Sequence, residues 1–222
     1  MDERNLMPNP EKTAFSATVT RQVGLPYLLY RPPGYERRKP WPLVLFLHGM
    51  GERGTDLALV PVHGLARRIA AGDEFPFVAV MPQCPPDSFW HEQLDALEAL
   101  LDHAQETLNV DARRVYLTGL SMGGFGTWLL AAHCPQRFAA IAPVCGGGIP
   151  WTAARLKDVP VWAFHGSQDT LVHPRESKRM VQAVKDAGGT ARLTMYTGVG
   201  HDSWTQAYAN PRLYSWLLRH SR

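Results

Sequence analysis

The pentapeptide Gly119-Leu120-Ser121-Met122-Gly123 carries the clearest chemical signal in the 222-residue sequence. It follows an apolar segment, 115–117, and precedes a sequence typical of a helix, so we expect a sharp turn from strand to helix here. Side chains at Gly119 and Gly123 would collide in such a turn, while the Ser121 hydroxyl stands clear of the backbone. We therefore interpret Ser121 as a nucleophile, in preference to an incidental serine in a glycine-rich turn.

A serine hydroxyl is a poor nucleophile near neutral pH and needs a base, which an acid in turn orients. Where a serine stands at such a turn, the acid and the base follow it in that order along the chain. Asp169 comes just after the apolar segment 161–164, and His201 comes just after the segment 191–196. Each residue type thus occurs in order and past a predicted strand, which predicts a triad of Ser121, Asp169 and His201.

Structural roles are the alternatives for the acid and the base. Asp169 could cap a helix or close a turn, and His201 could be a surface loop histidine beside Asp202. Because the chain has nine histidines, a single one is weak evidence. The interpretation therefore depends on the complete, ordered set.

Acyl transfer builds negative charge on the carbonyl oxygen of the substrate, and two fixed N–H groups should meet it. The amide of Met122, at the expected helix N-terminus, is one candidate. The amide of Met50 is the second, in the glycine-rich loop that follows the apolar strand 43–47. We interpret His48, in the same loop, as a structural histidine that bonds loop backbone rather than as a second base.

The elements that must position these residues alternate between strands and helices. This order predicts an α/β fold with a mostly parallel sheet covered by helices on both faces. Ligands gather at the carboxyl edge of such a sheet. Eight strands and their helices leave little sequence for a lid domain, so we expect loops 83–92 and 146–158 to roof the site. The expected strands are 15–23, 27–31, 43–47, 77–81, 114–118, 138–144, 159–164 and 191–196, and the expected helices lie within 57–71, 93–107, 122–133, 174–187 and 211–219.

The composition is that of a globular protein. Hydrophobic residues make up 45% and charged residues 19%, which excludes a disordered chain and a coiled coil. The net charge is +3, without a long basic run, so a nucleic-acid partner is not expected. No apolar run approaches the ~18 residues of a membrane helix, so no membrane partner is expected either. The oligomeric state stays open.

Cysteine usage and the N-terminal segment bear on location and domain organisation. The three cysteines have no metal-type spacing, and an odd, low count suggests a reducing compartment. A Cys134–Cys145 bridge remains an alternative. Residues 1–14 are polar and predict a flexible tail before one domain over 15–222. We expect a cytoplasmic protein, although a removed signal peptide would leave the same trace.

Beyond these patterns, the chain resembles the small α/β-hydrolases of the carboxylesterase and dienelactone-hydrolase-like group, in the branch of the predicted peptidases and phospholipase/carboxylesterases. The segments that carry the resemblance span Leu45 to Trp204: LFLHGMGERG, MPQCP followed by Trp90, TGLSMGG, PVCGGG, FHGSQD and GVGHDSW.

The resemblance implies an eight-stranded, mostly parallel sheet, a Ser–Asp–His triad and no cofactor. It places nucleophile, acid and base on Ser121, Asp169 and His201, and an oxyanion amide on Met50. Dienelactone hydrolases use a cysteine nucleophile, whereas this chain has a serine. Prolyl-peptidase relatives carry an accessory domain, for which this chain has no segment.

These observations predict a serine hydrolase that cleaves carboxylic esters, with short acyl or aryl esters favoured, through an acyl-enzyme. A thioesterase or peptidase with the same triad is one alternative, and a catalytically silent binding module is another. The dispersed histidines predict no metal site. If the strands are placed correctly, the site is lined by Gln83, Trp90, Trp151 and Trp204, although each tryptophan could equally be core or interface filler.

Overall fold

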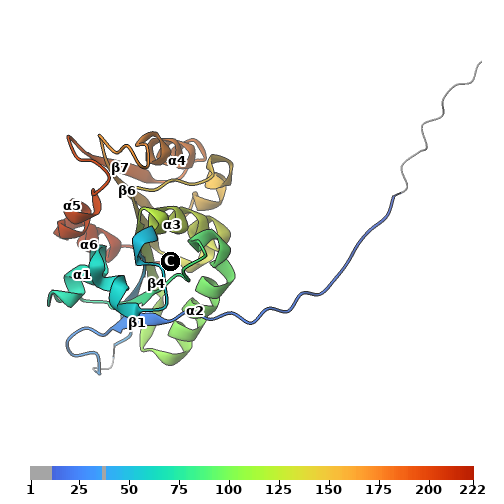
Figure 1. The fold of residues 1–222 in the computed structure, drawn as a ribbon, viewed down its shortest axis with the longest axis horizontal. Helices are drawn as coiled ribbons and strands as arrows, with labels where there is room; N and C mark the ends of the chain where they lie inside the picture. Colours follow the sequence, from blue (N-terminus) through green and yellow to red (C-terminus); the bar gives the residue numbers. More distant parts are fainter. Residues whose placement is uncertain (1–11, 37–38) are drawn as a thin grey trace, which may run out of the picture.

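A mostly parallel sheet forms the centre of the protein (Figure 1). The computed structural model describes residues 12–36 and 39–222, and in them seven strands lie in the order β1-β3-β2-β4-β5-β6-β7. Only β1, at one edge, is antiparallel to its neighbour. The predicted α/β class is confirmed. The strands are β1 (Tyr27–Tyr30), β2 (Trp41–Leu47), β3 (Val78–Pro82), β4 (Val110–Leu120), β5 (Ala140–Val144), β6 (Val161–Gly166) and β7 (Ala191–Tyr196).

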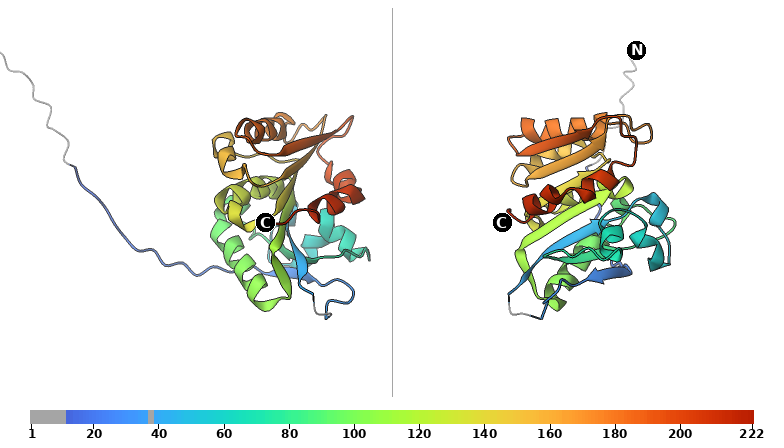
Figure 2. Two further views of the ribbon diagram at one scale, coloured as in Figure 1. Left: turned by 180° about the vertical axis from the view of Figure 1, so that it is seen from behind. Right: turned by 90° about the vertical axis from the view of Figure 1, so that its left-hand side faces the viewer.

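Helices cover both faces of the sheet, as Figures 1 and 2 show. One layer contains α2 (Leu94–Thr107), α3 (Met122–His133) and α4 (Arg175–Asp186), whose apolar residues share one core with the sheet. The other layer contains α1 (Gly64–Ala70), α5 (Trp204–Ala209) and α6 (Pro211–Leu217), which pack into a second core. The sheet is therefore buried on both sides.

Strand β2 shows how the sequence produces this arrangement. Leu43, Leu45 and Leu47 point into the first core, while Val44 and Phe46 point into the second. Successive side chains of a strand point to opposite faces, so a strand covered on both sides needs an unbroken apolar run.

The expected strand over 15–23 does not form. Residues 12–26 carry no secondary structure, and all but the end of this segment runs outward from the body of the protein (Figure 1), with Phe15 and Val19 92% and 88% exposed. Alternating apolar residues make a strand only when a neighbouring strand pairs with them, and here none does. Within residues 12–36 and 39–222 the sheet therefore has seven strands instead of the expected eight. Most of the expected tail over 1–14 lies outside the described residues.

Two helical regions differ in detail from the prediction. The segment within 57–71 divides into a 3-10 helix, Leu57–Val62, and α1, with Gly64 at the junction in the left-handed region (φ 65°). A side chain at Gly64 would also meet the rings and methyl groups of Phe46 and Leu120. Helix α5 was not predicted. Further 3-10 helices are Met50–Glu52, Trp90–Glu92, Pro135–Arg137 and Pro150–Leu156.

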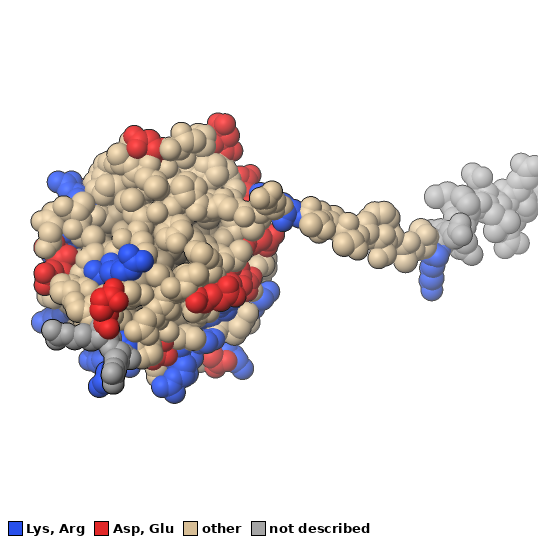
Figure 3. All heavy atoms as spheres, turned by 90° about the horizontal axis from the view of Figure 1, so that it is seen from below, with Lys and Arg blue, Asp and Glu red and all other residues tan. Residues whose placement is uncertain are grey.

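The carboxyl ends of β2 to β7 meet at one edge of the sheet, because these strands run parallel. The loops after β2, β4, β6 and β7 carry the candidate catalytic and oxyanion residues, and the segments after β3, β5 and β7 carry the residues predicted to line the site. On the face of the protein seen in Figure 3, acidic and basic side chains are interspersed rather than gathered by sign.

Candidate active site

Ser121 stands at the turn from β4 to α3 with an unusual backbone (φ 52°, ψ −115°). A residue other than glycine with positive φ is uncommon, and such strain gathers at functional sites. The glycines around it are required sterically, because a Cβ at Gly119 would overlap the Gly123 carbonyl and one at Gly123 would overlap the Leu47 carbonyl. The turn thus packs against β2 and presents the Ser121 hydroxyl at the carboxyl edge.

The structure brings the three predicted triad residues together. The Nε2 atom of His201 lies 2.9 Å from Ser121 Oγ, and its Nδ1 atom lies 2.7 Å from Asp169 Oδ2. Both distances are those of hydrogen bonds. Asp169 comes from the loop after β6, and His201 from the loop after β7.

The Asp169 carboxylate is buried, with 3% of the residue exposed. Its Oδ1 atom accepts hydrogen bonds from the backbone N–H groups of Leu171 (3.0 Å) and Val172 (2.9 Å). Burial raises the pKa of Asp169, but the hydrogen bonds from His201, Val172 and Leu171 outweigh burial and lower the pKa below its ordinary value. The carboxylate is therefore ionised at neutral pH.

Asp202, the neighbour of the candidate base, has another partner. Its carboxylate accepts from the backbone N–H (3.1 Å) and the hydroxyl (3.0 Å) of Thr205, in the first turn of α5. A side chain in this position holds the start of a helix.

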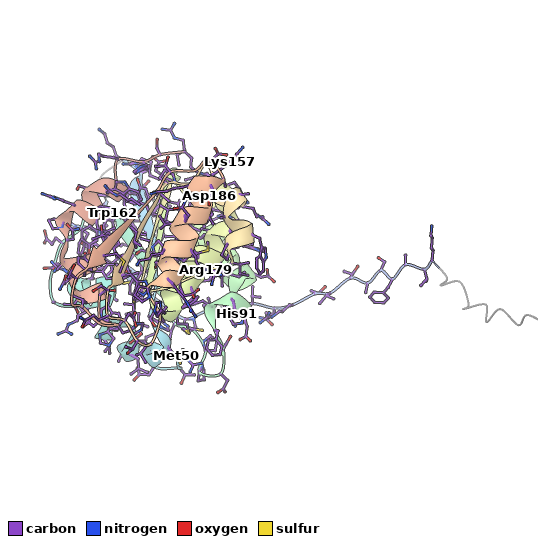
Figure 4. All side chains as sticks on the ribbon, turned by 90° about the horizontal axis from the view of Figure 1, so that it is seen from above. Met50, His91, Lys157, Trp162, Arg179 and Asp186 are labelled. Atoms are coloured by element: carbon purple, nitrogen blue, oxygen red, sulfur yellow. The ribbon has the colours of Figure 1, made fainter. Side chains whose placement is uncertain are left out.

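A cavity of about 260 Å³ lies beside Ser121. Of the four residues predicted to line the site, Trp90 lines this cavity. Both candidate oxyanion residues, Met50 and Met122, line it as well. In Figure 4, Met50 and His91 lie at one side of the molecule, with Lys157 and Asp186 toward the opposite side. The cavity is lined by Met50, Phe89, Trp90, His91, Ser121, Met122, Phe125, Gly126, Leu129 and Val172.

The backbone near the cavity suits an anion. Met122 is the first residue of α3, where amide N–H groups have no partner within the helix. Met50 begins the 3-10 helix that follows β2, and it lines the same cavity. The two amides therefore come from loops on neighbouring strands, β4 and β2.

The loop that carries Met50 is tied to the structure beneath it. The Nε2 atom of His48 accepts from the Cys84 N–H (2.9 Å), and its Nδ1 atom lies 2.6 Å from the Gly49 carbonyl oxygen. The indole N–H of Trp90 donates to the His48 carbonyl (3.0 Å). His48 thus bonds loop backbone, as predicted.

Three of the four residues predicted to line the site do not border this cavity. Gln83 is fully buried, and its Nε2 donates to the carbonyls of Glu52 (3.0 Å) and Asp56 (2.8 Å), which braces the Met50 loop from below. Trp151 is 85% exposed on the 3-10 helix Pro150–Leu156. The Trp204 ring packs edge-on against His201, with the ring centroids 5.3 Å apart.

The prediction missed several residues of the cavity wall. Phe125 and Leu129 lie on α3 at a spacing of four, which places side chains on one helix face, and they follow Ser121 at the same interval. That spacing was readable in the sequence. Phe89 and Val172 come from loops and His91 from the 3-10 helix Trp90–Glu92, and no local pattern marks them.

The cysteines contribute no bridge, since Cys84, Cys134 and Cys145 are all free and buried. Among the described residues, no group of three or more His, Cys, Asp or Glu side chains is arranged to hold a metal ion. None of the described helices has both the length and the apolar composition needed to cross a membrane.

The sequence and the fold of the chain are similar to those of known proteins. The bifunctional acetylxylan esterase/xylanase of Neocallimastix patriciarum is 26% identical over 156 residues, which cover 65% of this chain and 22% of that protein. Poly(3-hydroxyalkanoate) depolymerase C of Paucimonas lemoignei is 31% identical over 121 residues, covering 48% of this chain and 28% of that protein. The chain thus spans less than a third of the length of either relative.

The structural likeness covers more of the chain. The crystal structure of a thermostable esterase superposes with a TM-score of 0.80 and 34% sequence identity, over 89% of this chain and 60% of that one. The α/β-hydrolase fold that the sequence predicted is confirmed by this match. The sequence also matches the dienelactone hydrolase family over residues 67–211, and the chain belongs to that family.

Proposed function

We propose that the chain is a serine hydrolase that cleaves carboxylic esters through an acyl-enzyme on Ser121. The observation that carries the proposal is the unbroken chain of contacts from Ser121 Oγ to His201 Nε2 (2.9 Å) and from His201 Nδ1 to Asp169 Oδ2 (2.7 Å). A nucleophile bonded to a base that is in turn held by an acid is the arrangement that activates a serine.

The protonation states follow from the contacts. Because Asp169 is ionised, it accepts a hydrogen bond from His201 Nδ1 and holds the proton of the neutral ring there. The lone pair of Nε2 is then left facing the Ser121 hydroxyl. His201 therefore stands ready to take the serine proton.

The reaction proceeds in two halves. His201 takes the Ser121 proton as Oγ attacks the ester carbonyl, and the amides of Met50 and Met122 bind the oxyanion. The intermediate collapses when His201 gives its proton to the leaving alcohol, which leaves an acyl-Ser121 ester. A water molecule, deprotonated by the same histidine, then attacks this ester. The acid departs as His201 returns the proton to Oγ.

The cavity supports short acyl or aryl esters as substrates. Its volume of about 260 Å³ lies just below the ~300–1,000 Å³ of ordinary ligand pockets. Phe89, Trp90 and Phe125 give it aromatic walls that can pack against an aryl ring. The acetylxylan esterase among the relatives is named for an acetyl ester, the smallest acyl group of this kind.

A fluorophosphonate probe tests the proposal. It should label the wild-type protein on Ser121, with the site assigned by peptide mass spectrometry, and should leave Ser121→Ala unlabelled. The same variant should fold normally and lose about 10⁶-fold in turnover of p-nitrophenyl acetate, as seen when a triad nucleophile is removed.

Matched acetyl substrates compare the possible leaving groups. An oxygen ester should be cleaved with a higher kcat/KM than the corresponding thioester or anilide. A preference for the thioester or the anilide would make the chain a thioesterase or an amidase with the same triad. Absence of both labelling and hydrolysis would make it a silent binding module.

A further inference from the structure

A second histidine touches the candidate acid, and the reaction just described does not use it. His165 lies near the end of β6 and is fully buried. Its Nε2 atom is 3.1 Å from Asp169 Oδ2, the same oxygen that His201 contacts. The Asp169 carboxylate thus lies between two imidazole rings.

The partners of the His165 ring decide which nitrogen carries the proton. Nε2 faces two oxygens, Asp169 Oδ2 and the Val172 carbonyl (2.8 Å). An ionised carboxylate and a carbonyl can only accept, so Nε2 must donate. Nδ1 lies 2.7 Å from the Ser177 hydroxyl, which can donate to it. The same hydroxyl also donates to the Gly146 carbonyl (2.8 Å), so its single proton is shared between this carbonyl and Nδ1.

The surroundings favour a neutral ring with this single proton. Burial lowers the pKa of His165, and a proton taken up by His201 would lower it further, while the Val172 carbonyl and the Asp169 carboxylate raise it. Burial outweighs the rest, so the pKa lies below its ordinary value.

We propose that His165 is a positioning residue for this site, whose Nε2–H holds Asp169 Oδ2 in place against His201 Nδ1. The inference rests on the proposed function and adds a residue to it. With His165 included, each carboxylate oxygen receives two donors: Oδ1 from the backbone of Leu171 and Val172, and Oδ2 from the two histidines.

Two consequences follow for catalysis. The terminal torsion of an aspartate is broad, so a carboxylate that loses one donor can turn away from its remaining partner. The donor from His165 also shares the negative charge of Oδ2. Without it, more of that charge acts on His201, and the protonated base is stabilised relative to the neutral one. Loss of the His165 donor should therefore lower kcat and also move the acid limb of the kcat/KM profile to higher pH.

His165→Leu and His165→Gln separate positioning from packing. Leucine fills the space without a donor, whereas the glutamine side chain keeps an N–H that can reach Asp169 Oδ2. His165→Leu should lose roughly 10-fold in kcat with little change in KM, the low end of the range seen when residues that orient metal ligands are replaced. His165→Gln should restore most of kcat and return the acid limb toward its wild-type position.

Cys134→Ala serves as the control for stability. Cys134 is fully buried at the far end of α3, about 20 Å along the helix from Ser121, and its loss opens a small cavity there. This variant should be destabilised without any movement of the acid limb. If His165 has only a structural role, His165→Leu should behave like Cys134→Ala. Its activity would then fall only as far as its stability does, and the acid limb of the kcat/KM profile would not move.

Ser177→Ala and a direct measurement of the tautomer keep the test decisive if His165→Leu does not fold. Ser177→Ala removes the donor to Nδ1 and should give a smaller loss of kcat in the same direction. Imidazole ¹⁵N shifts of Ser121→Ala, assigned by comparison with the double variant that adds His165→Gln, should show a neutral His165 protonated at Nε2 near pH 7. A proton on Nδ1 alone, or wild-type kinetics in folded His165→Leu, would overturn the inference.

Probe labelling distinguishes this failure from failure of the proposed function. If the wild-type protein is labelled on Ser121 and hydrolyses esters while His165→Leu behaves like it, only the role of His165 is wrong. If the wild-type protein is neither labelled nor active, the proposed function itself fails.

Discussion

His201 Nδ1 lies 2.7 Å from Asp169 Oδ2, although the two residues are 32 positions apart in the chain. The carboxylate of Asp202, directly next to His201, is instead bound to Thr205 at the start of α5. The acid that contacts the candidate base is therefore the one that the neighbouring ends of β6 and β7 bring close in space, and not the one next to it in sequence.

This relationship predicts opposite results for two Asp→Asn variants. Asp169→Asn should fold and lose up to ~10⁴-fold in kcat, because an amide favours the wrong tautomer of the base. Asp202→Asn should keep kcat within a few-fold and lose at most ~1 kcal/mol of stability at the helix start. Steady-state kinetics and urea unfolding of both variants provide the check. Damage confined to Asp202→Asn would mean that the acid is misassigned.

The cavity predicts a preference for short acyl chains. Each methylene removed from water contributes ~0.8 kcal/mol, but a cavity of about 260 Å³ has room for few of them. In a series of p-nitrophenyl esters from acetate to palmitate, kcat/KM should be highest between acetate and butyrate.

Leu129→Ala, which enlarges the cavity, should move this optimum to longer chains. Trp151→Ala, at an 85% exposed position, is the control and should leave the optimum unchanged. A wild-type rate that climbs steadily to palmitate would show that this cavity does not receive the acyl group.

His48 predicts a loss of stability in mild acid. Burial lowers its pKa from 6.5 to about 4, and protonation of Nε2 would break its hydrogen bond with the Cys84 N–H. In the unfolded chain His48 binds a proton below pH ~6.5, whereas in the folded protein it stays neutral down to about pH 4. The stability present above pH 6.5 is therefore lost as the pH falls through this window, by up to about 3 kcal/mol at 1.36 kcal/mol per pKa unit.

Urea unfolding of the wild type and of His48→Gln between pH 7 and pH 4 measures this loss. Glutamine does not titrate, so the free energy of unfolding of the variant should fall less steeply over the window. Equal slopes for the two proteins would exclude His48 as the source.

The turn around Ser121 predicts unequal tolerance of alanine at two glycines. A Cβ on Gly123 would overlap the Leu47 carbonyl, which is backbone and cannot move aside, whereas a Cβ on Gly51 meets no atom within 4 Å. Gly123→Ala should lose at least about 3 kcal/mol of stability or fail to fold, and Gly51→Ala should keep the fold. Near-ultraviolet circular dichroism and urea midpoints decide the matter, and a stable Gly123→Ala protein would contradict the geometry.

The class of fold and the candidate chemistry could be predicted from the sequence pattern. Ser121, Asp169 and His201 were identifiable because each follows an apolar segment, and the ends of parallel strands meet at one edge of a sheet. Gly119 was identifiable for a local steric reason, because a Cβ there would overlap the Gly123 carbonyl, whereas the clash at Gly123 is with Leu47 of the neighbouring strand. Patterns of this kind depend on residues close together in the chain, so they can be recognised in the sequence alone.

Features that depend on contacts with distant parts of the chain could not be predicted from the sequence and became visible only in the folded structure. The segment 15–23 alternates like a strand yet pairs with nothing, because a strand requires a neighbour that no local pattern supplies. Trp90 lines the cavity whereas Trp151 is exposed, because burial depends on the elements packed around a side chain. His165 is only four positions from Asp169, but the other partners of its ring are the Val172 carbonyl before α4 and the Ser177 hydroxyl within α4, which the sequence pattern does not mark.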